Sequence, residues 1–314
     1  MTQTANDMDF LSRWNISGVL RRADLEILGS PNRSAERFAF ADPEGKLYIA
    51  EGFDLRKTAG QTAQTELLEF FADRGLPVMP WIRTKDGRAG VSAMARFWQV
   101  RPFADADPLP RRTLGYNTQY AGLWEDFLRQ LDDVSHDARL PRPPGERFLF
   151  SNYLPHLEAF AKRRMPEVSA GLAEIRDALT PFFRAEPELP VMLAHGDFHP
   201  GNCLVKNGRI SCVIDWEFVG WKTAGYDLAL LTGCLGMDDP LWLTEGAAAD
   251  MCRRMLASSR IPGAAKAFFP DLTAAIRLGW LGEWIDLDDR QTAQDELRYI
   301  RLLLELRENL PGSV

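Results

Sequence analysis

One segment, from Val191 to Asp227, constrains the fold of this 314-residue chain more than any other. It reads VMLAHGDFHPGNCLVKNGRISCVIDWEFVGWKTAGYD. An apolar run leads into His195-Gly196-Asp197, and two further apolar runs flank Asn207-Gly208, the strongest short signal for a tight β-hairpin. The segment therefore predicts a strand, a polar loop that ends at Asn202, and a hairpin whose second strand ends at Asp215.

Three polar side chains leave these predicted strand ends and can converge on one point. They are Asp197 after the first strand, Asn202 before the hairpin, and Asp215 after it. Phosphoryl transfer needs such a set, because its transition state is stabilised by positioning and charge neutralisation. Mg²⁺ prefers oxygen ligands and takes only one or two carboxylates, leaving room for phosphate and water. Asn202 and Asp215 therefore suit the metal, and Asp197 suits the proton of a substrate hydroxyl.

The run HGDFHPGN with IDWE downstream resembles the aminoglycoside phosphotransferase and choline kinase superfamily, whose members are relatives of protein kinases. The resemblance implies ATP as phosphoryl donor, Asp197 as catalytic base, and Asn202 and Asp215 as Mg²⁺ ligands. Asp227, in Tyr226-Asp227-Leu228-Ala229, resembles the buried aspartate that braces the catalytic loop in that family. The implied acceptor is a hydroxyl group of a small molecule, such as an amino alcohol, a sugar or an aminoglycoside.

The order of the expected elements fits this resemblance. Before residue 104 the pattern indicates strands around one helix, Thr62 to Arg74, which stops at Gly75; later segments are mostly helical. We therefore predict an α+β, protein-kinase-like fold with an antiparallel β-rich nucleotide-binding lobe over residues 1–103. A polar, proline-punctuated linker, 104–112, leads to a mainly helical catalytic and substrate lobe, 113–314. The expected strands of the first lobe cover 18–27, 36–41 and 47–52, with two more around Lys85-Asp86-Gly87 that end at Phe103. Expected helices of the second lobe cover 114–134, 151–164 and 169–183, with more from Tyr226 onward.

The first lobe departs from the family at the strand that usually carries a phosphate-binding lysine. The matching run is Tyr48-Ile49-Ala50-Glu51, so a glutamate stands in the lysine's place. Lys46 is no simple substitute, because an odd number of residues separates it from Glu51 and its side chain points to the other strand face. Arg37, on the preceding strand, is the favoured replacement, ahead of Arg33, Arg56 and Lys57.

The other nucleotide contacts follow only from the resemblance. Glu66 matches the helix glutamate that usually pairs with the lysine, and a solvated helix face is the competing interpretation. Adenine is expected on backbone groups of Gln99, Val100 and Arg101. The glycine-poor turn Gly29-Ser30-Pro31-Asn32 stands where the phosphate-covering loop would be. The chain has no GxGxxG and no GxxxxGK motif, which excludes Rossmann and P-loop sites.

An aromatic pair bears on the acceptor. Trp280 and Trp284 are four residues apart, hence on one helix face, and Asp286, Asp288 and Asp289 follow. Aromatic faces next to carboxylates suit a cationic amine. A core-facing tryptophan pair beside a solvated acidic loop is the competing interpretation.

Composition limits the partners. The net charge is −7 and no dense run of Lys and Arg occurs, so a nucleic-acid partner is not expected. No apolar stretch approaches the ~18 residues that a membrane span requires, and the start, MTQTANDMDFLSRW, lacks the apolar region of a secretion signal. The cytoplasm is therefore the expected location. The four cysteines form no CxxC pair, which argues against a zinc site or a disulfide framework; Cys203 and Cys212 are expected to face each other across the hairpin.

Two functions remain open from the sequence. The favoured one is an active small-molecule kinase. The alternative is a catalytically degraded kinase-fold protein that binds a nucleotide or a partner, which Glu51 suggests and the intact Asp197, Asn202 and Asp215 oppose. A protein kinase is disfavoured, because neither HRD nor a DFG-to-APE segment is present.

Overall fold

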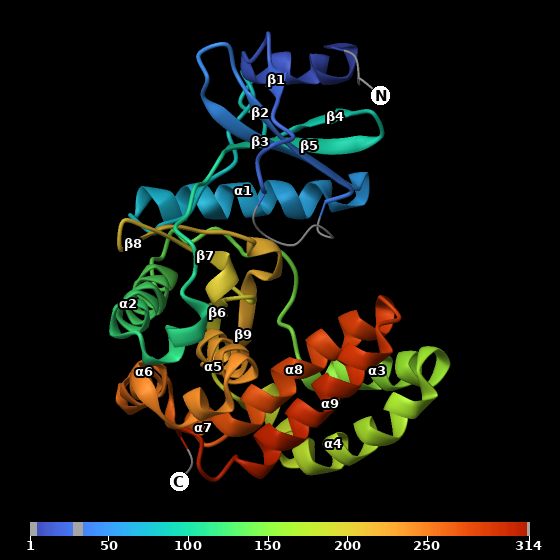
Figure 1. Ribbon diagram of the computed structural model, residues 1–314, viewed down its shortest axis with the longest axis vertical. Coiled ribbons are helices and arrows are strands. Elements are labelled where there is room, and N and C mark those ends of the chain that lie inside the picture. Colours follow the sequence, from blue (N-terminus) through green and yellow to red (C-terminus); the bar gives the residue numbers. More distant parts are fainter. Residues whose placement is uncertain (1–4, 28–33, 313–314) are drawn as a thin grey trace. The chain divides into compact units, whose positions relative to one another are not determined.

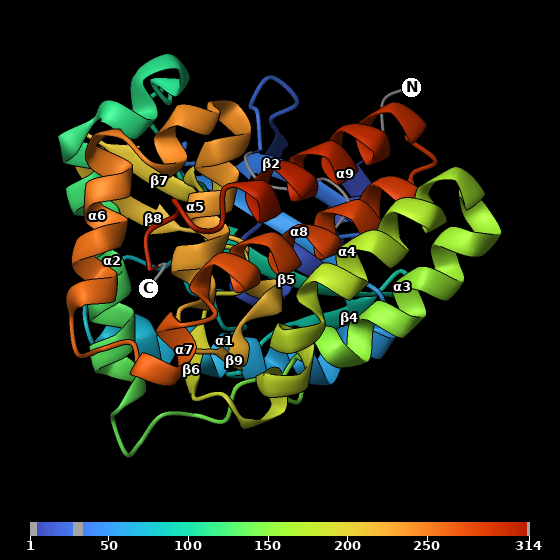
Figure 2. The same ribbon diagram turned by 90° about the horizontal axis from the view of Figure 1, so that it is seen from below.

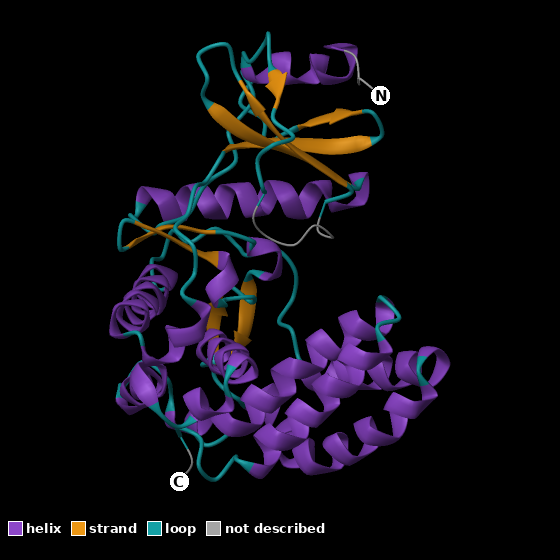
Figure 3. Cartoon of the chain, in the orientation of Figure 1, coloured by secondary structure: helices purple, strands orange, loops and turns teal. Residues whose placement is uncertain are grey.

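The computed structural model describes residues 5–27 and 34–312, and the chain divides into two compact units. Most strands belong to the first unit and most helices to the second (Figure 3). The hairpin segment with Asn202 and Asp215 is grouped with the first unit, while the lobe limits expected around 104–112 stay a prediction. The first unit combines Met1–Pro108, His136–Gly145 and Gly201–Glu217, and the second combines Leu109–Ser135, Glu146–Pro200 and Phe218–Val314.

An antiparallel five-stranded sheet forms the centre of the first unit (Figure 1). Side chains of successive strand residues point to opposite faces. On one face Phe38, Phe40, Tyr48 and Trp98 form a buried core together with residues of the 3-10 helix η1 (Ala5–Trp14). The strand order is β1 (Leu20–Arg21), β2 (Glu36–Ala41), β3 (Leu47–Phe53), β5 (Arg96–Pro102) and β4 (Val91–Ala93).

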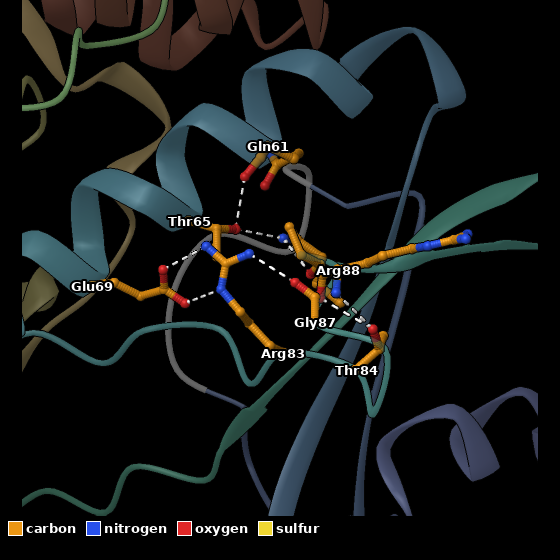
Figure 4. A network of polar contacts seen from close by, with 9 residues as sticks. Gln61, Thr65, Glu69, Arg83, Thr84, Gly87 and Arg88 are labelled. Atoms are coloured by element: carbon orange, nitrogen blue, oxygen red, sulfur yellow. Dashed lines mark hydrogen bonds and ion pairs between the residues drawn. The ribbon is translucent and has the colours of Figure 1, made fainter.

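Helix α1 (Thr58–Asp73) is joined to the other face of this sheet by buried polar contacts. The amide of Gln99 on β5 donates to Thr65 Oγ1 at 2.9 Å and to the Ala89 carbonyl at 3.1 Å. Figure 4 shows Thr65 on α1 and, one turn along, the ion pair of Glu69 with Arg83, whose closest atoms are 2.6 Å apart. The helix ends just before Gly75, whose φ of +79° makes it the predicted stop.

Two expectations for the sheet are wrong in detail. The hairpin between β4 and β5 turns at Met94-Ala95, with φ of +49° and +56°, and not at Lys85-Asp86-Gly87. Neither residue is a glycine or an asparagine, so no turn signal marked the position. Asp86-Gly87 forms a separate tight turn, in which the Gly87 N–H donates to the Thr84 carbonyl at 2.8 Å. The first expected strand, 18–27, shortens to β1.

Strands β7 (Cys203–Lys206) and β8 (Arg209–Val213) form the predicted hairpin. Its turn, Asn207-Gly208, has φ of +51° and +73°, as a type I′ turn requires. The register shifts by one residue between Leu204 and Val205, so that Ser211 is an extra residue in β8. Cys203 is therefore opposite Val213, and the expectation that it faces Cys212 is wrong.

The second unit contains a two-stranded sheet, β6 (Val191–Ala194) with β9 (Gly220–Thr223), and the remaining helices. Figure 2 shows α3, α4, α8 and α9 side by side, and the buried carboxylate of Glu296 on α9 accepts two hydrogen bonds from Arg277 on α8, at 2.6 and 2.7 Å. In the described part of the chain, no helix is long and apolar enough to cross a bilayer. The helices are α2 (Thr118–Ser135), α3 (Phe150–Arg164), α4 (Pro166–Ala185), α5 (Tyr226–Asp238), α6 (Gly246–Ala257), α7 (Gly263–Lys266), α8 (Phe269–Asp286) and α9 (Arg290–Glu305).

Candidate functional site

A pocket in the first unit lies beside α1, on the sheet face that carries Glu51. Two of its polar atoms are buried and have no hydrogen-bond partner among the described residues: Trp81 Nε1, a donor, and Gln61 Oε1, an acceptor. Buried polar groups are normally satisfied, so an unpaired donor and an unpaired acceptor in the wall of one pocket make this region a candidate for a polar site. The pocket is lined by Glu51, Phe53, Gln61, Gln64, Leu68, Met79, Trp81, Arg101 and Val213–Glu217.

Inside this pocket the unexpected Glu51 is paired with a cation. Gln99 is opposite Glu51 in the β3–β5 ladder, so Arg101, two residues further on, points to the same face. Its guanidinium lies 3.1 Å from Glu51 Oε1, and both side chains are buried. The Trp81 ring is 5.8 Å from the same guanidinium. A buried arginine thus supplies positive charge to the pocket, held by the residue that stands in the lysine's place.

The other predicted nucleotide residues lie around this pair. Arg37 is opposite Glu51 in the β2–β3 ladder, is half-buried, and donates to the Ile27 carbonyl at 3.1 Å. The Val100 carbonyl accepts the Ile82 N–H at 2.7 Å, and the side chain of Gln99 is bonded to α1, so the adenine position expected there stays a prediction. The turn Gly29–Asn32 and Arg33 lie outside the described residues.

The pairing of Glu66 with a phosphate-binding cation stays a prediction. Glu66 is exposed on α1, whereas Gln61, Gln64 and Leu68 are the residues of this helix that line the pocket. Its charge acts on Arg83 outside the pocket. Helix α1 therefore presents two amides and one leucine to the pocket. The exposure of Glu66 is what the competing interpretation, a solvated helix face, describes.

Asn202 and Asp215 are brought together by the hairpin. The Ile214 N–H donates to the Asn202 carbonyl at 2.9 Å, so both residues sit at the same open end of β7 and β8. Asn202 is buried, and Asp215 lines the pocket with Glu217. In the part of the chain that the structure describes, no cluster of three or more His, Cys, Asp or Glu side chains could hold a metal. One carboxylate and one amide are nevertheless the sparse oxygen set that Mg²⁺ uses when phosphate supplies further ligands.

Asp215 also adopts an unusual backbone conformation. Its φ is +69°, in the left-handed region that residues other than glycine seldom adopt, although asparagine and aspartate enter it more readily than the rest. Strained conformations of this kind persist where the surroundings impose them, often at functional sites. The turn directs the chain away from β8 directly after the strand has delivered this carboxylate to the pocket.

The loop with Asp197 belongs to the second unit and is braced from α5. The buried Asp227 carboxylate accepts the N–H groups of His195 and Gly196, at 2.7 and 2.9 Å. The N–H of Asp197 in turn donates to His195 Nδ1 at 3.1 Å. Gly196 has φ of +88°, and a Cβ there would lie 2.3 Å from the Phe218 carbonyl oxygen. His195 and Asp227 therefore shape the loop, as the resemblance implied for Asp227.

Burial controls the ionisation of the loop's neighbours. It raises the pKa of Asp227 to about 6, although the two backbone N–H groups and the charge of Lys222 oppose the rise. Burial also lowers the pKa of Lys222 to about 8, against the charge of Asp227. Lys222 was not predicted as a functional residue; a lone lysine in the run VGWKTAGYD gives no motif by which to find it.

The predicted aromatic pair divides between two environments. The ring of Trp280 meets that of His199 edge to face at 5.8 Å, and His199 Nε2 lies 3.8 Å from the Asp197 carboxylate, so Trp280 is near the loop. Trp284 is half-buried, and its buried Nε1 has no hydrogen-bond partner in the part of the chain that the structure describes. Asp289 in the acidic loop accepts the Thr292 N–H as the N-cap of α9, which lowers its pKa. That carboxylate has a structural role.

Comparisons with known proteins identify the family and the fold. The family model described as phosphotransferase enzyme family (APH) matches residues 30–259. A homoserine kinase of Granulibacter bethesdensis is 28% identical over 247 residues, which cover 76% of this chain and 75% of that protein. A homoserine kinase of Gluconobacter oxydans is 34% identical over 147 residues, which cover 44% of this chain and 46% of that protein.

Solved structures share the fold. The amicoumacin kinase hAmiN, in complex with AMP-PNP, Ca²⁺ and Ami, has a TM-score of 0.66 at 15% identity, over 93% of this chain and 92% of its own. Spectinomycin phosphotransferase APH(9)-Ia, in complex with ADP and spectinomycin, has a TM-score of 0.63 at 15% identity, over 97% of each chain. These likenesses confirm the predicted α+β, protein-kinase-like fold.

Proposed function

Because the chain belongs to the phosphotransferase enzyme family, we propose that it is a kinase that moves the γ-phosphoryl group of ATP to the hydroxyl of a small molecule. The two homoserine kinases among its relatives support a hydroxy amino acid as the acceptor class. The observation that carries the proposal is the hairpin end that joins Asn202 to Asp215, and Asp215 lines a pocket that also holds a buried arginine. An ATP-dependent reaction of this kind belongs in the cytoplasm.

Each residue has a distinct task in the proposed mechanism. Asp197 accepts the proton of the acceptor hydroxyl as the oxygen attacks the γ-phosphorus, and ADP leaves. Asn202 and Asp215 would hold Mg²⁺, which when bound neutralises charge on the phosphate oxygens. Asp227 keeps the loop of Asp197 in shape through the His195 and Gly196 N–H groups. We propose that Trp280, whose ring contacts that of His199, also contacts the acceptor. For Trp284 the same role is predicted only from its spacing on the helix.

For the nucleotide phosphates we propose Arg101 as the cation, with Glu51 as its positioning residue. Arg101 lines the pocket, whereas Arg37, the candidate favoured from the sequence, is half-buried on the same sheet face and bonded to the Ile27 carbonyl. A guanidinium binds phosphate through two parallel N–H groups, which a lysine cannot do. This proposal gives Glu51 a purpose in an active enzyme and so weakens the case for a degraded one.

Calorimetry with the full chain tests the nucleotide part. We expect ATP to bind in the presence of Mg²⁺ and at least tenfold more weakly without it, and Asp215→Asn to abolish the difference. Absence of binding to the wild type at millimolar ATP would contradict the proposal and favour the degraded-kinase alternative.

Turnover tests the catalytic part. Asp197→Asn keeps the shape of the side chain but cannot take up a proton, so we expect kcat to fall by about 10²–10⁴-fold. ATP affinity should stay within about threefold, because Asp197 is assigned no nucleotide contact. The assay is ADP release with L-homoserine, choline, sugars and aminoglycosides as acceptors. Undiminished turnover in the variant would remove Asp197 from the mechanism.

A further inference from the structure

Lys222 is a buried cation to which the mechanism above gives no task. It lies on β9 opposite Met192, with only 7% of its surface exposed. Within the described residues its Nζ makes no hydrogen bond and has no carboxylate oxygen within 4 Å. The negative charge that acts on it is that of Asp227, whose carboxylate accepts hydrogen bonds from two backbone N–H groups. A charged side chain that is largely buried and has no hydrogen bond within the described residues costs free energy, so the fold tolerates it for a reason other than stability.

The side chain of Lys222 runs along the loop that ends in Asp197. A Cβ built on Gly196 would lie 2.7 Å from Lys222 Cε, so the lysine stem packs against the backbone of the residue directly before the proposed base. Only glycine leaves this space open. The approach places the ammonium beside the loop that would receive the acceptor hydroxyl.

Aromatic rings surround the ammonium without neutralising it. Its Nζ is 5.2 Å from the centroid of Tyr226 and 5.6 Å from that of Phe148, within the range of cation–π attraction. Both rings are half-buried and so retain exposed surface, and Tyr153 extends the same wall, its ring 5.9 Å from that of Phe148. The charge of Asp197 contributes to the raised pKa of Tyr226, which places this wall within electrostatic reach of the proposed base.

We propose that Lys222 binds an anionic group of the acceptor, a carboxylate, and thereby makes the enzyme selective for alcohols that carry one. The inference rests on the proposed kinase function and names the acceptor class of the same site. A carboxylate would complete the missing hydrogen bonds of the ammonium, and the aromatic wall would cover the carbon chain between carboxylate and hydroxyl.

The other anion to consider is a phosphate of the nucleotide. The pocket proposed for the nucleotide is lined entirely by first-unit residues and has its own cation, Arg101. Every neighbour of Lys222 named here belongs to the second unit. We therefore assign Lys222 to the acceptor, and the experiment distinguishes the two anions.

The test compares two acceptors that differ only in the carboxylate, L-homoserine and 3-aminopropan-1-ol, with Lys222→Met. Methionine preserves the length and packing of the stem and removes the charge. We expect kcat/KM for L-homoserine to fall at least 100-fold, mainly through KM, and the ratio of kcat/KM between the two acceptors to fall by a similar factor. Lys222→Arg, which keeps the charge, should retain more of this selectivity, and Lys162→Met, an exposed lysine of α3, is the matched control.

Several outcomes would overturn the assignment. Equal losses for both acceptors, which leave the ratio unchanged, would assign Lys222 to the phosphate or to the loop. No loss for either acceptor would show that Lys222 takes no part in binding them. If the wild type binds ATP but phosphorylates neither alcohol, the proposed function fails for this acceptor class. Calorimetric binding of the two alcohols then tests separately whether Lys222 binds a carboxylate. Binding of L-homoserine by the wild type and not by Lys222→Met then supports the inference; binding of neither alcohol by the wild type contradicts it.

Discussion

At the scale of single residues, this protein concentrates unfavourable features near its proposed chemistry. Asp215 has left-handed backbone, Glu51 and Arg101 are buried charges, and Lys222 is a buried cation with no ion-pair partner among the described residues. Each costs stability, and the buried charges are not required by the fold, since apolar residues of similar volume could fill those positions. The sequence indicated Asp215 through its motif, but Lys222 and the side chain of Arg101 became visible only with the three-dimensional neighbours.

Asp215 allows backbone and metal effects to be separated. Asn tolerates positive φ about as well as Asp, whereas Ala at this φ of +69° adds strain of roughly 1–2 kcal/mol. We expect Asp215→Asn and Asp215→Ala to lose Mg²⁺-dependent ATP binding alike, and only the alanine variant to lose that much free energy of unfolding. Urea titration and calorimetry measure the two quantities. Retained Mg²⁺ dependence in Asp215→Asn would exclude this carboxylate as the ligand.

Lys222 predicts a pH-dependent cost to stability. Its pKa of about 8 in the folded chain is below the ordinary 10.5, so the unfolded chain binds more protons between these values and stability rises with pH there. We expect Lys222→Met to be more stable than wild type below pH 8, by on the order of 3 kcal/mol, with the gap closing toward pH 10.5. Asp227, the charged group facing Lys222, is already ionised throughout this window. Denaturation at pH 7 and 10 checks this, and a variant less stable at pH 7 would indicate a structural lysine.

At the scale of elements, the hairpin β7–β8 shows what a sequence pattern reveals and what it omits. Asn207-Gly208 predicted the turn correctly, because both residues tolerate the positive φ of a type I′ turn. The bulge at Ser211 has no comparable signal, and it shifts β8 by one residue relative to β7. Met94-Ala95 is a second case, in which ordinary residues form a turn because the strands on either side pair. Element types were thus predictable, and registers were not.

The bulge predicts a sharp effect of deleting Ser211. Without the extra residue, β8 would pair one position further along, and Asp215 would move out of its place beside Asn202. We expect the deletion variant to remain folded by circular dichroism but to lose Mg²⁺-dependent ATP binding. Ser211→Ala keeps the bulge and removes only the hydrogen bond from Ser211 Oγ to the Leu204 carbonyl, so it is the matched control and should bind as wild type. Normal binding by the deletion variant would show that the bulge does not position the site.

At the scale of the whole molecule, chemistry-bearing residues come from segments far apart in the chain. The motif in residues 191–227 predicted Asp197, Asn202 and Asp215 as site residues, because these three lie close together in the sequence. The partner of Glu51 is separated from it by 50 residues and depends on the register between β3 and β5. A cation was therefore expected on the neighbouring strand, at Arg37, while the structure offers a second one, Arg101. Such a pair is determined by the strand register of the folded sheet, which no local sequence pattern specifies.

Folding stability can report on the Glu51–Arg101 pair without confusing structure and function. Removing Arg101 alone would leave a buried carboxylate unpaired, at a cost of about 3–5 kcal/mol, so a single variant could lose ATP binding through misfolding. The double variant Glu51→Leu/Arg101→Leu removes both charges and should be as stable as wild type or more so. We nevertheless expect it to gain less stability from ATP–Mg²⁺.

The size of that loss follows from linkage. At a nucleotide concentration 100 times the wild-type Kd, the ligand stabilises the wild type by about 2.7 kcal/mol, and a tenfold weaker affinity removes about 1.3 kcal/mol of this. Thermal and urea denaturation with and without ATP–Mg²⁺ measure the difference, with Arg37→Leu as the comparison. Full stabilisation of the double variant, together with a loss in Arg37→Leu, would return the phosphate-binding role to the residue that the sequence favoured.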